Sequence, residues 1–249
     1  WKNRTFTSNL PVNAEDISTA FPKHQVLKVG FRGEWEPFLK YQVRNGVKSR
    51  IDNSSPTVWA GFEKAFKDVL DTDIDYLHLY AGAKQHLELG GGNRLSYKIE
   101  GGFFNGSGPI AFVDYKHFQG NQTWLTTGDP VGGFLMLPYY EYSTRDEYVE
   151  AHAHYQFRTL ALTQIPLFWM LGLKENLFVH YLYTPTSKNY MEVGYGLDNI
   201  YKIFRLELGV SFNDFKYRDF GVFIGISSQI GANVDVESGE EENSINIGF

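Results

Sequence analysis

Hydrophobic and polar residues alternate with a period of two along much of this chain. In "YLHLYAGAKQHLELG" (76–90), aliphatic and small residues from Leu77 to Leu89 fall on one face, and His78, Lys84 and His86 fall on the other. The stretches "FRLELGVSFND" (204–214) and "FGVFIGISSQIG" (220–231) alternate in the same way. Period-two alternation over so many residues predicts β-strands.

Similar stretches, separated by turn sequences such as "GGGN" (90–93) and "TPTSKN" (184–189), predict an all-β fold with antiparallel strands. Long helical periodicity is nearly absent. The expected strands exceed the mode of about 5–6 residues for globular sheets and match the roughly 9–11 residues of a tilted transmembrane strand. Besides the three stretches above, strands are expected at 26–36, 37–48, 56–67, 94–105, 109–118, 147–158, 175–184 and 189–198, with weaker candidates at 132–143 and 243–249.

The chemistry of the two faces distinguishes between kinds of β protein. The polar face carries full charges together with Gly and Tyr, and aromatic residues gather near the ends of the expected strands. Charged lumen positions and aromatic girdles are typical of an antiparallel transmembrane β-barrel, whose apolar face meets lipid. The alternative is a soluble barrel or sandwich that binds a ligand. The aromatic residues near strand ends are Trp35, Phe38, Tyr139, Tyr140, Tyr142, Tyr181, Tyr183 and Tyr201.

Composition narrows the functional classes. The chain has 249 residues, of which 16 are Tyr and 20 are Phe, and it has no cysteine, which excludes disulfides and thiol chemistry. Its net charge of −6 argues against nucleic acid as a partner. No apolar run approaches the roughly 20 residues of a transmembrane helix. The start, "WKNRTFTSNL", has no signal-peptide apolar region, which favours a piece of a longer protein.

The stretch "YVEAHAHYQF" (148–157) places Glu150, His152 and His154 on one face of a strand. Two interpretations are open. A zinc site would use such side chains but needs further ligands from other strands, with His180 as one candidate. The favoured interpretation is a polar row on the barrel wall, hydrogen-bonded to a neighbouring strand or to an inserted loop.

Two further groups are candidate loop-docking residues. Arg205 and Glu207 lie on the polar face of an otherwise apolar strand, and we expect them to form lumen charge pairs, with Glu192 as a possible partner, or to anchor a loop. "GNQT" combines a turn glycine with hydrogen-bonding side chains, which indicates either a simple loop turn or docking of the loop in the lumen. Its residues are Gly120, Asn121, Gln122 and Thr123.

No catalytic constellation, phosphate-binding loop or cofactor motif is found, so we expect no enzymatic activity and no cofactor. "IPLFWMLGLK" (165–174) indicates either an apolar segment at the membrane interface or a patch that docks a partner. "DVESGEEEN" (235–243) is most simply a solvated acidic loop, and "SINIGF" (244–249) is either a terminal strand or a tail.

The order of "YKHFQGNQT" (115–123), "LPYYEYSTRDEYVEAHAHYQF" (137–157), "IPLFWMLGLKENLFVHYLYT" (165–184) and "NYMEVGYGLDNIYKIFRLEL" (189–208) resembles a family of unknown function among Bacteroidota outer-membrane proteins. The resemblance covers about residues 56–231. It implies a barrel that follows an N-terminal carboxypeptidase-like regulatory domain.

That family is in turn distantly similar to the BamA-like outer-membrane assembly superfamily, in which a long loop folds back into the lumen before the final strands. The resemblance implies lead-in residues at 1–25, barrel strands over 26–231 with the long loop at 119–146, and an acidic loop plus terminal strand or tail at 232–249. Two departures stand out: "FQGNQTWLTTGD" lacks the arginine of the superfamily's loop signature, and too few strands precede the loop. Either the chain is the C-terminal part of a barrel, or it is an entire barrel of smaller size.

The resemblance implies a non-enzymatic outer-membrane component of protein assembly or export. Its expected surroundings are the outer-membrane bilayer with its lipopolysaccharide and other outer-membrane proteins or lipoproteins. The alternative is a structural barrel or passive pore that serves as a subunit of a surface complex.

Overall fold

The computed structural model describes residues 2–4, 24–50, 55–69, 72, 74–106, 108, 110–126 and 130–226. The acidic run at 235–243, the expected terminal strand at 243–249 and most of the lead-in at 1–25 lie outside these residues. Among the described residues, no helix has both the length and the apolar character to cross a membrane.

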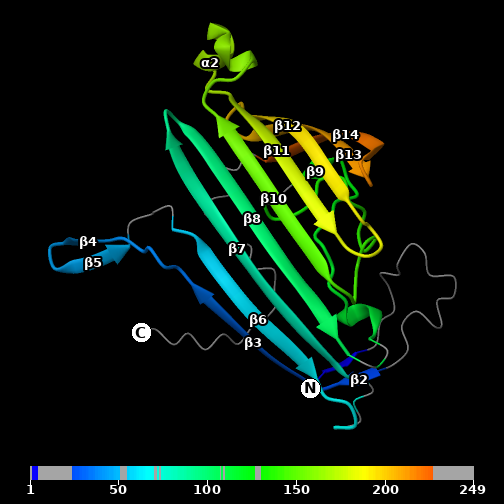
Figure 1. Cartoon of the computed structure of the whole chain (residues 1–249). Coiled ribbons are helices and arrows are strands. Elements are labelled where there is room, and N and C mark those ends of the chain that lie inside the picture. Colours follow the sequence, from blue (N-terminus) through cyan, green and yellow to red (C-terminus); the bar gives the residue numbers. More distant parts are fainter. Residues whose placement is uncertain are drawn as a thin grey trace.

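One large sheet dominates the described part of the chain (Figure 1). Nine of its strands follow one another as antiparallel neighbours, and a short tenth strand, β9 (Leu125–Thr126), pairs in parallel with the last of them. In spatial order the nine are β3 (Lys28–Trp35), β6 (Thr57–Ala65), β7 (Tyr76–Gly90), β8 (Asn93–Asn105), β10 (Tyr148–Phe157), β11 (Lys174–Tyr183), β12 (Tyr190–Ile200), β13 (Phe204–Asn213) and β14 (Lys216–Ile226).

Two further pairs of short strands form two-stranded sheets of their own, β1 (Lys2–Arg4) with β2 (His24–Val26) and β4 (Tyr41–Arg44) with β5 (Val47–Arg50). The second pair corrects the prediction of one strand over 37–48. Asn45 and Gly46 adopt positive φ angles of 52° and 77°, the conformation of a tight hairpin turn, so the chain reverses there.

The predicted strand at 109–118 is also wrong. Residues Phe112–Asp114 form the 3₁₀ turn η1, and Lys116 makes an isolated bridge with Thr144 in place of a ladder with the sheet. The apolar residues that suggested a strand here follow an irregular path, on which Ile110 and Phe118 are buried in two different apolar clusters. The weaker candidate strand at 132–143 is a series of turns.

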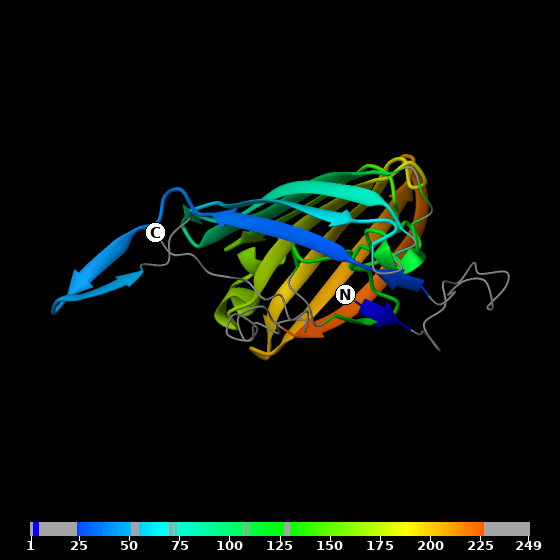
Figure 2. The ribbon, with the colours of Figure 1, turned by 90° about the horizontal axis from the view of Figure 1, so that it is seen from below.

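The sheet curves strongly, and residues 111–126 and 130–147, here called the inserted segment, lie against its concave face (Figure 2). Its two edges, β3 and β14 with β9, do not pair with each other within the described residues. Along β10 to β13, most convex side chains are apolar and at least partly exposed, whereas most concave side chains are buried and many of them are polar. Along β11, for example, Val179 is 42% exposed and the adjacent His180 is 3% exposed.

The apolar core therefore lies between the inserted segment and the concave face. One buried cluster joins Phe118, Phe134, Leu137 and Tyr142 of the inserted segment to Tyr148, Leu182 and Tyr190 of the sheet. A second, near β2 and the start of β7, contains Val26, Ala65, Ile74, Tyr76 and Ile110.

Aromatic rings on the concave face lie directly opposite glycines of the neighbouring strand. A Cβ at Gly194 would meet the ring of Phe178 at 2.1 Å, and a Cβ at Gly82 would meet that of Trp59 at 2.4 Å. Both pairs are direct partners in the ladder. The missing side chains make room for the rings and allow the sheet to bend around the inserted segment. The same relation holds for Tyr80 with Gly61 and for Tyr148 with Gly102.

Candidate loop-docking site on the concave face

Glu192 on β12 is a central attachment point of the inserted segment. Its side chain is fully buried, and its two carboxylate oxygens accept hydrogen bonds from the backbone N–H groups of Leu135 at 2.7 Å and Met136 at 2.9 Å. The hydroxyl of Tyr190 donates a third bond at 2.6 Å. A buried carboxylate needs such donors to offset its desolvation, so the segment's backbone and Glu192 stabilise each other.

A second attachment lies at the edge strand β14. The backbone of Leu125 and Thr126 pairs with Ile224 and Gly225, and the N–H of Ile224 donates to the carbonyl of Trp124 at 2.8 Å. The Thr126 hydroxyl donates to Glu207 on β13 at 3.2 Å. These bonds join the inserted segment to the last two strands of the sheet.

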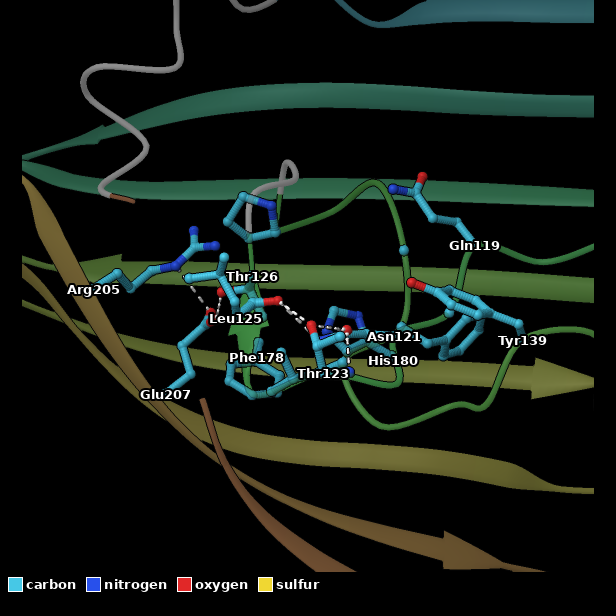
Figure 3. A pocket seen from close by; sticks show the side chains of 15 residues that line it. Gln119, Asn121, Thr123, Leu125, Thr126, Tyr139, Phe178, His180, Arg205 and Glu207 are labelled. Atoms are coloured by element: carbon cyan, nitrogen blue, oxygen red, sulfur yellow. Dashed lines mark hydrogen bonds and ion pairs between the residues drawn. The ribbon is translucent and has the colours of Figure 1, made fainter. Parts of the chain in front are cut away.

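Arg205 and Glu207 lie beside this attachment, and both are buried (Figure 3). The Nε of Arg205 is 3.3 Å from Glu207 and 4.0 Å from Asp198. The suggested pairing of Arg205 with Glu192 is therefore wrong, because Glu192 is occupied by the backbone of the inserted segment. Arg205, Glu207 and His180 line one side of a partly open cavity of about 280 Å³, and residues of the inserted segment line the other side (Figure 3).

A third attachment lies near the turn between β13 and β14. Arg218 donates to both carboxylate oxygens of Glu141, at 2.8 and 2.9 Å. The hydroxyl of Tyr142 accepts hydrogen bonds from Asn213 at 3.0 Å and from Arg218 at 3.1 Å. At the other side of the segment, Lys116 forms an ion pair with Glu100 on β8. The inserted segment is thus bound to strands from β8 to β14.

Among the "GNQT" residues, Gly120 and Asn121 shape the inserted segment, whereas Gln122 and Thr123 lie at its surface. The N–H of Asn121 donates to the carbonyl of Leu137 at 2.9 Å, which joins two arms of the segment. A Cβ on Gly120 would lie 2.2 Å from that carbonyl oxygen, so only glycine fits this close approach. The Asn121 side chain accepts from the N–H and hydroxyl of Thr123, a local turn, and Gln122 and Thr123 are exposed.

The residues of the "EAHAH" stretch lie on the concave face, as part of its wall. Glu150 pairs with Lys98 on β8 at 2.7 Å. The Nδ1 atoms of His152 and His180 are 2.9 Å apart, so one ring donates a hydrogen bond and the other accepts it. The Phe134 ring packs on His152, with 4.8 Å between the ring centroids. His154 is buried next to them. Within the described ranges, no set of three or more His, Asp or Glu side chains is arranged to hold a metal ion.

His117 is a titratable group within the inserted segment. Its Nδ1 lies 2.7 Å from the Ser143 hydroxyl, and its ring contacts Phe112 and Tyr140. Burial lowers the pKa of His117 below its ordinary value, although a hydrogen bond with the Phe112 backbone and the charge of Asp114 act in the opposite direction. The packed segment therefore favours the neutral imidazole.

Several docking residues were not found from the sequence. Each of them bonds to a residue far away in the chain, so its neighbours in sequence carry no signal of the contact. Tyr190 is the exception, because it stands two residues before Glu192 on the same strand face, a spacing that the alternation makes visible. The residues missed are Glu100, Lys116, Thr126, Glu141, Tyr142, Tyr190 and Arg218.

The fold and the site define a class of protein: an all-β chain with a curved, antiparallel-rich sheet whose polar concave face is filled by an inserted segment. The family model for the C-terminal domain of a family of unknown function, DUF5686, matches residues 1–197, and the chain belongs to this family. The match begins earlier and ends earlier than the 56–231 expected from the quoted motifs. A search of curated proteins finds no match.

Proposed function

We propose that this chain is the membrane-spanning part of an outer-membrane β-barrel and that it acts without enzymatic chemistry in the assembly or export of outer-membrane proteins. The observation that carries the first half is the inverted polarity of the sheet. Its convex face exposes many large apolar side chains, and its concave face buries many polar and charged ones, such as Glu150, His152, Glu192 and Arg205.

This polarity is unfavourable in water and favourable in a bilayer. Exposed apolar surface costs about 25 cal/mol per Å², and large contiguous apolar patches on soluble monomers are rare. Strands β10 to β14 have 10 or 11 residues each, the length of a tilted strand across the hydrocarbon core. The convex side chains that would face lipid include Val58, Phe62, Ile99, Phe103, Val149, Leu177, Val179, Val193, Leu208, Phe220, Val222 and Ile224.

The inserted segment supports assembly or export over a passive pore. It fills the concave face immediately before β10–β14, the layout implied by the resemblance to BamA-like proteins. It is attached through a buried carboxylate, an edge-strand pairing and an arginine whose Nη2 donates to both oxygens of a carboxylate. An open conduit would need this segment to leave. Bacteroidota origin and a preceding carboxypeptidase-like regulatory domain are part of the same proposal.

The test is a detergent pull-down of the full-length native protein from outer membranes, followed by mass spectrometry. Recovery of the barrel-assembly machinery or of unfinished barrels would support assembly or export. Recovery of one fixed set of surface lipoproteins or transporters would favour a structural subunit. Release from membranes without detergent would refute the membrane-spanning barrel itself.

Electrical recording distinguishes a passive pore from a barrel whose lumen is filled. We expect the purified protein in planar bilayers to show little steady conductance, because the inserted segment occupies the lumen. A large, stable conductance with the inserted segment intact would contradict the proposed filling and favour a pore.

A further inference from the structure

The connection between β10 and β11, residues 158–173, projects beyond the end of the sheet (Figure 1). It contains the 3₁₀ turn η2 (Leu162–Gln164) and the short helix α2 (Pro166–Met170). No charged residue occurs from Thr159 to Leu173, and a cation stands at each side, Arg158 and Lys174. We call residues 159–173 the apolar tip.

The apolar tip is held in a defined shape by Glu175, the second residue of β11. This side chain is fully buried, and its carboxylate accepts hydrogen bonds from a run of consecutive backbone N–H groups. The hydroxyls of Thr163 and Tyr195 donate to the same carboxylate. A carboxylate with so many donors orders the loop around it. The backbone donors are Leu160 at 3.1 Å, Ala161 at 3.0 Å, Leu162 at 3.0 Å and Thr163 at 2.9 Å.

The ordered tip presents several large apolar side chains outward. Met170 is 77% exposed, Leu167 is 64% exposed and Trp169 is 54% exposed. Ile165 and Leu171 add to the same surface. A loop fixed in this shape cannot bury these side chains by collapsing, because the bonds to Glu175 hold its base. They therefore need a partner beyond the described residues.

The position of the tip identifies that partner. The tip continues directly from strands β10 and β11, whose convex side chains Val149, Leu177 and Val179 are the apolar surface that would face lipid. Apart from the Trp169 indole N–H, its outward helical side chains have no hydrogen-bonding group, whereas protein interfaces use about one hydrogen bond per 100–200 Å². Tryptophan and flanking basic residues are typical of the region between headgroups and acyl chains.

We infer that the apolar tip inserts into the bilayer interface at the end of the sheet, with Trp169 at headgroup depth and the exposed Arg158 beside anionic headgroups, whereas Lys174 is directed to Gln156 on the concave face. This inference rests on the proposed membrane-spanning function. The tip would anchor the β10–β11 end of the sheet at a fixed depth in one leaflet.

The absence of cysteine from the chain allows a direct test, since a single introduced cysteine can be labelled alone. The full chain carrying Met170→Cys is labelled with an environment-sensitive nitrobenzoxadiazole fluorophore. It is then reconstituted into vesicles of phosphatidylethanolamine and phosphatidylglycerol, with and without spin-labelled lipids. Gln122→Cys, exposed on the inserted segment, is the water-facing control, and Val179→Cys on the convex face is the lipid-facing control.

We expect a blue-shifted emission and quenching by spin-labelled lipid at position 170, and neither effect at position 122. Quenching at 179 with a water-like signal at 170 would overturn the interfacial tip and leave the membrane-spanning proposal standing. Water-like signals at both 170 and 179 would overturn both. A label at 170 that is shielded from water but not quenched by lipid would also overturn the inference, since protein and not lipid would then cover the tip.

Discussion

Replacing Glu192 with glutamine tests whether this side chain attaches the inserted segment to the sheet. In the native structure both carboxylate oxygens are used, one by the N–H of Leu135 and the other by the N–H of Met136 and the Tyr190 hydroxyl. Glutamine has the same shape but only one oxygen. Whichever way the amide turns, its NH₂ group must face at least one donor, so at least one buried hydrogen bond is lost.

A hydrogen bond to a charged group contributes about 1.5–3 kcal/mol. Loss of one such bond should weaken docking of the segment about 10- to 150-fold, at about 1.4 kcal/mol per factor of ten. Hydrogen–deuterium exchange of peptides covering 130–140 measures the opening directly, because exchange of protected amides follows local opening. We expect the Leu135 and Met136 amides to exchange faster by that factor in Glu192→Gln.

The matched control is Glu88→Gln, a carboxylate of β7 that is 60% exposed and pairs with Arg94 away from the inserted segment. It should leave exchange in 130–140 unchanged. Equal protection of this peptide in Glu192→Gln and in the native protein would refute the role of Glu192 as an anchor.

Three further predictions concern the same region. Gly120→Ala should lower the free energy of unfolding by about 1–3 kcal/mol, since its Cβ would overlap the Leu137 carbonyl, and Gly33→Ala, whose Cβ would lie 3.6 Å from the Phe31 ring, should be tolerated in thermal unfolding. Burial lowers the pKa of His117 in the docked segment below the value of about 6.5 that it has in the unfolded chain. The stabilisation that neutral His117 gives to docking is therefore complete above a pH of about 6.5 and is lost as the pH falls through the lowered pKa. Limited proteolysis of the segment should therefore increase on acidification, and His117→Asn should make cleavage less dependent on pH. The same pH dependence in His117→Asn as in the native chain would contradict this role of His117. Because the Nδ1 atoms of His152 and His180 hydrogen-bond to each other, we expect a chelator to leave Tm unchanged, and a clear drop in Tm would restore the metal interpretation of the "EAHAH" stretch.

The alternation of side chains made most strands predictable from the sequence. The strands at 76–90 and 204–213 needed only period-two patterns, because each presents one polar and one apolar face. The turn at Asn45 and Gly46 was overlooked, although Asn-Gly between alternating residues is a strong hairpin signal. The segment 109–118 alternates without joining the sheet, because its apolar residues pack between layers.

The candidate site was predictable only in part. Buried polar residues on strand faces, such as Glu192 and Glu207, stand out in sequence because an acid is costly in an apolar strand. What each one binds could not be deduced, since the backbone N–H groups of Leu135 and Met136 carry no side-chain signature. The pairing of Arg205 with Asp198 depends on how neighbouring strands are aligned, which no local pattern encodes.

The ring-on-glycine contacts of the concave face have a consequence for how the strands find their alignment during folding. A slip of one residue would turn every polar side chain outward, so the alternation itself forbids it. A slip of two residues keeps every side chain on its own face of the sheet, so the polar and apolar pattern does not disfavour it. It would, however, move Tyr148 from Gly102 onto Glu100 or Phe104, and Trp59 from Gly82 onto Tyr80 or Lys84. The glycines thus disfavour two-residue register shifts, which the polar and apolar pattern alone would allow.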